Sequence, residues 1–138
     1  MIKDKDLIIF KPIGYVKHNH KDVPRHYNLS DLVGDIIINK AYLEGLLDIK
    51  KNSLIVVLFY FHKSKKFTKD LLRRVPPHGD KELGVFSICS PNRPNPIGLS
   101  ILRVIDIVEN KIHVKHIDML NETPILDIKP YVKPVFEN

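Results

Sequence analysis

Short apolar runs separated by polar, proline-containing stretches fill this chain, and helical periodicity is scarce. The longest apolar run, Leu54–Phe61, is rich in β-branched and aromatic residues and predicts a strand that ends near His62. Residues Ile112–Ile117 alternate apolar and basic side chains, which indicates a half-exposed strand. Further strands are predicted at Leu7–Phe10, Ile13–Val16, Gly34–Asn39, Val85–Ser87, Leu99–Val108 and Ile125–Ile128.

These elements predict an all-β fold with little helix. Only Tyr42–Leu47 has the pattern of one or two helical turns. A turn at Asn110 joins Leu102–Val108 to Ile112–Ile117 as a hairpin. Because antiparallel sheets remove their exposed edges by closing or stacking, we expect a single, antiparallel β-barrel-like domain over residues 1–138.

Length and composition exclude several classes of protein. The longest apolar run has eight residues, whereas a membrane-spanning helix needs about 20. The acidic residues near the N-terminus and its short apolar stretch do not fit a signal peptide. With Cys89 as the single cysteine, the chain cannot form an internal disulfide. We therefore expect a cytoplasmic protein that makes no use of a membrane.

The positive charge points to an anionic partner. The formal net charge is +6 and the isoelectric point is near 9.4, which favours nucleic acid. Residues 63–74 carry six lysines and arginines against one acid, Asp70, with Phe67 between them. Such a segment either contacts RNA phosphates or is an ordinary solvated basic loop, and the residues alone leave both open.

Three prolines, Pro91, Pro94 and Pro96, predict a stiff loop between two apolar runs. A loop this rigid holds its polar groups in one arrangement and loses little entropy when it binds a ligand. A surface crossover without a ligand is the alternative. The polar residues in question are Ser90, Asn92, Arg93 and Asn95.

Other polar residues give weaker signals. His18 and His20 lie in a lysine-rich loop, so we interpret them as solvated histidines and predict no metal site. Cys89 could be a nucleophile only beside a base, and a small buried cysteine under the proline loop is the preferred interpretation. Asp127, Lys129 and Tyr131 follow a turn and form either a polar site or an ion pair at a sheet edge.

Two longer motifs resemble the TrmO family, whose members are also called YaeB-like or TsaA-like. They read S-P-N-R-P-N-P-I-G-L-S at 90–100 and D-x-L-x-x-T-P-I-L-D-I-K-P-Y at 118–131. Shorter matches follow in the family's order: I-G-Y-V at 13–16, F-x-F-H at 59–62 and G-V-F at 84–86. The resemblance covers nearly the whole chain, and the proline motif is specific.

The resemblance implies a homodimeric β-barrel methyltransferase that uses S-adenosyl-L-methionine. Its substrate would be a tRNA adenosine next to the anticodon, position 37, which already carries a threonylcarbamoyl group and is methylated at N6. Carried over by position, the cofactor contacts are Pro24, Arg25, His26, His62, Lys63, Cys89, Leu99, Asn121, Glu122, Thr123 and Pro124. For the substrate side we select Arg93, Asn95, Asp127, Lys129 and Tyr131, and we expect these to share one pocket with the proline loop.

Two departures from the family pattern leave other functions open. Position 89 is often arginine in the family and is Cys89 here, and the frequent D-G-T-P reads Asn121–Glu122–Thr123–Pro124. An altered barrel of this kind could bind S-adenosylmethionine as a sensor or methylate a small metabolite. A cofactor-free RNA-binding barrel is the third possibility.

Overall fold

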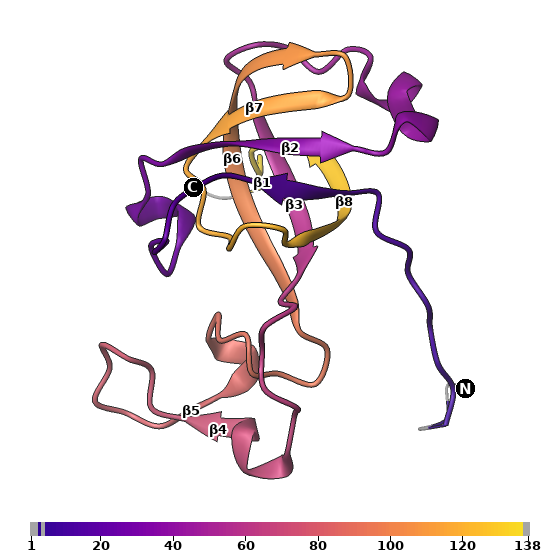
Figure 1. Cartoon of the computed structure of the whole chain (residues 1–138). Helices are drawn as coiled ribbons and strands as arrows, with labels where there is room; N and C mark the ends of the chain where they lie inside the picture. The colour runs from indigo at the N-terminus through magenta and orange to yellow at the C-terminus, as the bar shows by residue number, and fades with distance from the viewer. Residues whose placement is uncertain (1–2, 4, 137–138) are drawn as a thin grey trace.

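Six antiparallel strands form a sheet that closes on itself in the computed structural model, which describes residue 3 and residues 5–136 (Figure 1). Their order around the ring is β1-β2-β7-β6-β3-β8. The bounds are β1 Gly14–Lys17, β2 Val33–Ile38, β3 Leu54–Tyr60, β6 Ile97–Val108, β7 Lys111–Lys115 and β8 Pro124–Pro130. The predicted antiparallel, barrel-like all-β fold is confirmed.

The helical segments of the described residues are short 3₁₀ turns. They are η1 Tyr27–Leu29, η2 Lys40–Leu46, η3 Lys69–Leu72 and η4 Val85–Ser87. Of these, η2 confirms the helical turns predicted near Tyr42–Leu47. Nowhere in the described part of the chain is there a helix with the length and apolar character needed to cross a membrane.

Alternate residues of each strand fill the interior of the ring. On β6, for example, Leu102 and Val104 are fully buried, while Arg103 between them is exposed. On β7, Ile112 and Val114 are fully buried, as the alternation of apolar and basic residues predicted. The inward-facing apolar residues of the strands therefore form one contiguous core.

The long strand β6 belongs to both halves of the ring. Residues 97–103 pair with β3, and residues 103–108 pair with β7. A register shift between Val104 and Asp106 marks an irregularity where the strand passes from one partner to the other. Such bulges bend a strand and help a sheet to close.

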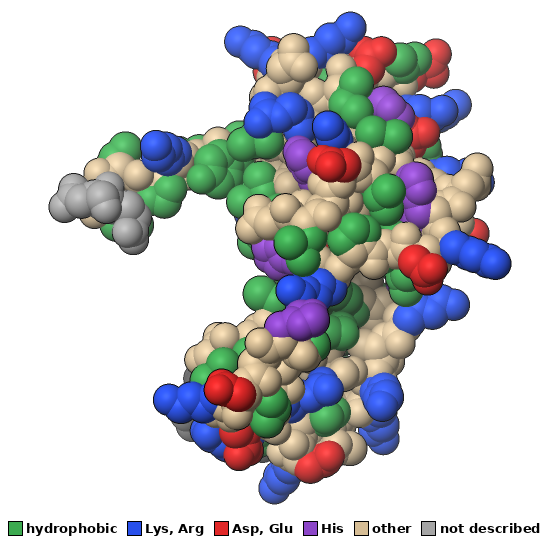
Figure 2. All heavy atoms as spheres, turned by 90° about the vertical axis from the view of Figure 1, so that its left-hand side faces the viewer, with side chains coloured by type: hydrophobic (Ala, Val, Ile, Leu, Met, Phe, Trp, Pro, Cys, Tyr) green, Lys and Arg blue, Asp and Glu red, His purple; other side chains and the backbone are tan. Residues whose placement is uncertain are grey.

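Between β3 and β6 the chain leaves the ring and forms a smaller lobe below it (Figure 1). The lobe contains a short antiparallel pair, β4 Arg73–Arg74 and β5 Leu83–Gly84. Figure 2 shows a hollow between this lobe and the barrel. The strand predicted at Val85–Ser87 is wrong: the β4–β5 ladder has only two residue pairs, and the Ile88 amide donates back to the Val85 carbonyl, closing a turn.

The strand predicted at Leu7–Phe10 is also wrong. These four apolar side chains are 65–85% exposed, on an arm that stands away from the barrel (Figure 2). The ladder stops at Ile13, whose amide donates to the Ile125 carbonyl. Pro12, the residue before Ile13, has no amide hydrogen, so it cannot continue the ladder towards the N-terminus.

Candidate functional site

A cavity of about 610 Å³ lies beneath the proline loop. Its walls come from the loop at residues 23–27, the end of β3 with residues 61–64, the proline loop with the start of β6, and residues 118–123. Segments that are distant in the sequence meet there because β3 and β6 are paired neighbours. The volume lies within the range of small-ligand sites.

The proline loop is held in shape by its own polar groups. One guanidinium nitrogen of Arg93 donates to the carbonyls of Ile88 and Ser90, at 3.0 and 3.1 Å. The Ser90 hydroxyl oxygen accepts from the guanidinium of Arg74 and from the backbone amide of Asn92, both at 3.1 Å. The loop also lines the cavity through Pro91 and Arg93, which favours the ligand loop over a plain surface crossover.

Asp118 is the residue that the sequence analysis missed. It lines the cavity, and its carboxylate accepts a hydrogen bond of 2.5 Å from the fully buried Ser100 on β6. Burial raises the pKa of Asp118, while the Ser100 hydroxyl and nearby His26 act in the opposite direction. An acid between the buried residues Ile117 and Met119 was the signal that could have identified it.

Aromatic residues were missed as well. Phe59 and Phe61 both line the cavity, with ring centroids 5.0 Å apart in an edge-to-face arrangement. Tyr27 lines the cavity beside His26, and burial is the main reason why the pKa of Tyr27 is raised. The half-buried rings of Tyr27 and Phe61 give the cavity surfaces of the kind that a planar base can stack on, while Phe59 is 3% exposed and packs behind them in the wall.

Most of the predicted cofactor residues are brought together here. The cavity is lined by Pro24, Arg25, His26, His62, Lys63, Cys89, Leu99 and Thr123, together with Arg93 from the predicted substrate side. Burial lowers the pKa of His62, the charge of Lys63 lowers it further, and Glu122 opposes both. The His62 imidazole is therefore neutral at neutral pH.

Cys89 differs from the preferred interpretation. It is exposed and lines the cavity, and is not buried under the loop. Its thiol is accordingly accessible to a ligand.

The turn at 121–124 contributes less than predicted. Of its four residues only Thr123 lines the cavity, and the Thr123 hydroxyl donates to the Leu120 carbonyl at 2.6 Å. The Asn121 side chain accepts from the backbone amide of His18 at 2.9 Å, so it braces the turn. Glu122 has a φ of 69°, in the left-handed region that favours glycine, and Pro124 begins β8.

Asp127, Lys129 and Tyr131 line a different cavity, of about 650 Å³, together with residues of η2. The Lys129 ammonium lies 2.9 Å from the Asp127 carboxylate. The two cavities have no lining residue in common, so the expectation that this segment and the proline loop wall one pocket is wrong. The reason is that β8 runs antiparallel to β3 and carries the segment towards Leu54, where β3 begins. Asn95 is exposed and lines neither cavity.

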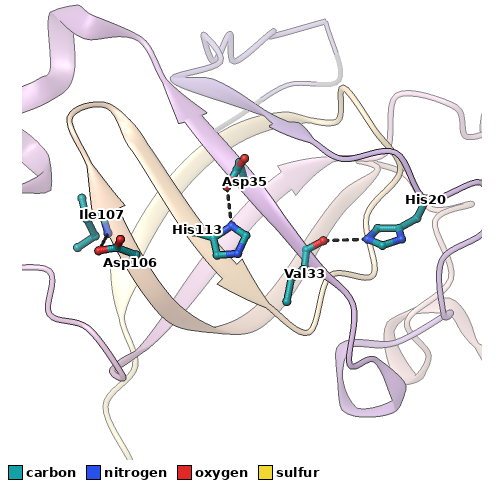
Figure 3. A network of polar contacts seen from close by, with 6 residues as sticks. All are labelled: His20, Val33, Asp35, Asp106, Ile107 and His113. Atoms are coloured by element: carbon teal, nitrogen blue, oxygen red, sulfur yellow. Dashed lines mark hydrogen bonds and ion pairs between the residues drawn. The ribbon is translucent and has the colours of Figure 1, made fainter.

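Several histidines outside the cavity have structural partners. His18 is buried, not solvated as expected, and its ring Nε2 lies 2.7 Å from the Met119 carbonyl. His20 bonds the Val33 carbonyl at 2.8 Å, and His113 lies 2.7 Å from the Asp35 carboxylate (Figure 3). Among the described residues, no group of three or more His, Cys, Asp or Glu side chains is placed to hold a metal ion.

Comparison with known proteins gives consistent matches. The family model for the tRNA-methyltransferase O N-terminal domain matches residues 15–135. An S-adenosyl-L-methionine-binding protein of Archaeoglobus fulgidus is 41% identical over 127 residues, which are 90% of this chain and 89% of that protein. A tRNA (adenine(37)-N6)-methyltransferase of Rattus norvegicus is 36% identical over 133 residues, which are 91% of this chain and 31% of that protein. The crystal structure of TrmO from Pseudomonas aeruginosa matches with a TM-score of 0.73 and 30% identity, over 92% of this chain and 57% of that one.

Proposed function

The chain belongs to the tRNA-methyltransferase O family, and from this premise we propose that it is an S-adenosylmethionine-dependent methyltransferase acting on tRNA. We further propose that the methyl group goes to N6 of threonylcarbamoyl-adenosine at position 37, in the cytoplasm. One observation supports this above the others: residues chosen by family position, from four separate segments, line a single cavity.

The side chains that line the cavity suit the chemistry of the cofactor. Tyr27 and Phe61, which are half-buried and line the cavity, offer ring faces for the adenine. Arg25 and Lys63 can receive the carboxylate of the methionine portion, and Asp118 can receive a positive group. When bound, S-adenosylmethionine supplies an electrophilic methyl group on a sulfonium.

The chain's own residues then have to position the reactants and exclude water. The proline loop forms one wall, and the Arg93 guanidinium keeps it closed. The remaining nitrogens of Arg93 and the exposed side chain of Asn95 are available to a substrate phosphate, carboxylate or base.

We assign tRNA binding to the small lobe. Lysine and arginine side chains are spread over the surface of this lobe (Figure 2). Contacts of lysine and arginine with phosphates would give affinity that depends strongly on salt. The residues concerned are Lys63, Lys65, Lys66, Lys69, Arg73 and Arg74.

The homodimer is part of the proposal. Apolar side chains at both ends of the described chain are open to solvent, among them Ile9 at 83% and Val135 at 96% exposure. A second copy of the chain would cover such surfaces. In a dimer, Asp127, Lys129 and Tyr131 keep their proposed role on the substrate side if their cavity faces the partner.

A second candidate is S-adenosylmethionine binding without tRNA methylation. It is favoured by the exposed Cys89 in a position where the family often has arginine. Incubation of the purified chain with S-adenosylmethionine and tRNA that carries threonylcarbamoyl-adenosine, followed by nucleoside mass spectrometry, separates the two. A nucleoside heavier by one methylene is expected. Cofactor binding by calorimetry without that product would support the sensor, and no binding would leave the cofactor-free RNA-binding barrel.

A further inference from the structure

We propose that Asp118 makes this cavity selective for a positively charged sulfonium nucleoside over the neutral thioether that remains after methyl transfer. The inference rests on the proposed function, because it concerns the ligand of the same cavity. Asp118 follows β7 in the sequence and lines the cavity. Among the described residues that form the lining, it is the one carboxylate.

Asp118 forms no ion pair within the described part of the chain, although His26 lies near enough to lower its pKa. Its side-chain partner is the neutral hydroxyl of Ser100 at 2.5 Å, and the ion pairs of the described residues all involve other carboxylates. A carboxylate that is largely removed from water without a counter-charge is unfavourable. A cationic ligand supplies the missing charge, and a neutral thioether does not.

The other charges of the cavity do not replace this effect. Arg25 and Lys63 are exposed, so solvent and salt screen their charges. Arg93 is half-buried, and its guanidinium is bonded to loop carbonyls. All three are cations and would oppose a sulfonium. Asp118 therefore determines the preference for positive charge in the interior of the cavity. A single charge pair at the effective dielectric of a protein site corresponds to a preference of about tenfold or more.

The preference should grow with pH. Because burial raises the pKa of Asp118, its carboxyl group is neutral at acidic pH and becomes charged at a higher pH than an exposed aspartate. The titratable groups around it are His26, His62, Tyr27 and Cys89. His62, whose pKa is lowered by burial, also loses positive charge as pH rises, which favours a cation too, so a variant at position 118 is needed to separate the contributions.

The test measures binding and does not need turnover. The full chain is titrated calorimetrically with S-adenosylmethionine and with S-adenosylhomocysteine, the neutral thioether, from acidic to neutral pH. In the unaltered protein the ratio of the two affinities should increase with pH. Asp118→Asn should lower that ratio by about tenfold at neutral pH, mainly by weakening S-adenosylmethionine, and should flatten its pH dependence.

Two further variants keep the test decisive. Asp106→Asn removes an exposed carboxylate that pairs with Lys51 at 3.1 Å and does not line the cavity, so the ratio should not change. Ser100→Ala keeps the Asp118 charge but removes its hydrogen bond, so the ratio should rise only at higher pH. This shift can be measured even if Asp118→Asn fails to fold.

An unchanged affinity ratio in folded Asp118→Asn, or an unshifted profile in Ser100→Ala, would overturn the inference and leave the proposed function intact. If neither ligand binds the unaltered protein, the proposed function itself fails.

Discussion

The ring of Phe59 lies directly over the α-carbon of Gly98, its register partner across the β3–β6 ladder. A β-carbon built on Gly98 would lie 2.2 Å from the nearest ring carbon. Both residues line the candidate cofactor cavity. The absence of a side chain at position 98 therefore allows an aromatic ring to cover the start of β6 and form part of the cavity wall.

Gly98→Ala should destabilise the protein and weaken cofactor binding together. The added methyl group has to displace the Phe59 ring, which is 3% exposed and has little space to move. Overpacking of this kind costs about 1–3 kcal/mol. Urea unfolding gives the change in stability, and calorimetry gives the change in cofactor affinity. Gly45→Ala is the matched control, because nothing lies within 4 Å of a β-carbon at Gly45 and its stability should not fall.

Glu122→Gly should stabilise the chain. Glu122 has a φ of 69°, which is unfavourable for a side chain with a β-carbon and open to glycine. Glycine relieves this strain, but its greater entropy in the unfolded state offsets part of the gain. We therefore expect the unfolding free energy to rise by about 0.5–1 kcal/mol. Asn52→Gly is the comparison, since Asn52 has a φ of 68° but asparagine tolerates this region better. An equal gain at both positions would contradict this explanation.

The sequence predicted what depends on local pattern. Apolar and basic residues alternate over residues 112–115, and β7 occupies Lys111–Lys115, one residue from the predicted start and two from the predicted end of Ile112–Ile117. Leu7–Phe10 has an equally strand-like composition and forms no strand, because strand formation requires a partner and Pro12 interrupts the ladder.

The candidate site, too, could be predicted only in part from the sequence. Family position identified residues such as His26 and His62, which line the cavity. It could not show that Asp127 lies in another cavity, because that depends on the direction of β8 in the closed sheet. Asp118 was quoted within a motif yet given no role, since only the structure shows its burial and its bond to Ser100.

The stability of the protein should depend on the titration of Asp118. Because burial raises the pKa of Asp118 in the folded protein above that of an unburied aspartate, its ionisation in the folded protein is unfavourable. The penalty is absent below the unfolded pKa and grows as pH rises through the folded pKa. Asp118→Asn should therefore lose the fall in stability that the unaltered chain shows in this window. Urea unfolding of both proteins from acidic to neutral pH measures it, and parallel curves would refute the assignment.

Affinity for tRNA should fall steeply with salt, and charge in the small lobe should determine how steeply. Lys65 and Lys66 are exposed there, and each phosphate contact contributes roughly 0.7–0.9 to the slope of log K against log salt. Replacing both with glutamine should weaken binding and lower the slope by up to about 2. Lys111→Gln, on the β6–β7 hairpin of the barrel, is the control: it also removes one positive charge, but outside the lobe, so it should leave the slope unchanged. Filter binding over a salt series provides the slopes, and a flat response would show that the lobe does not contact the backbone of tRNA.

Arg93→Ala should abolish most methylation while the barrel stays folded. The guanidinium bonds two loop carbonyls, those of Ile88 and Ser90, and both lie outside the barrel strands. Their loss releases one wall of the cavity, and hydrogen bonds to charged groups contribute about 1.5–3 kcal/mol each, so a reduction of more than tenfold is expected. Arg93→Lys keeps the charge but not the planar guanidinium, one nitrogen of which bonds both carbonyls, and it should recover little of the activity. Mass spectrometry of tRNA nucleosides measures the rate, and thermal unfolding checks the fold. If Arg93→Lys restores full turnover, Arg93 acts through its charge on the substrate and not by closing the loop.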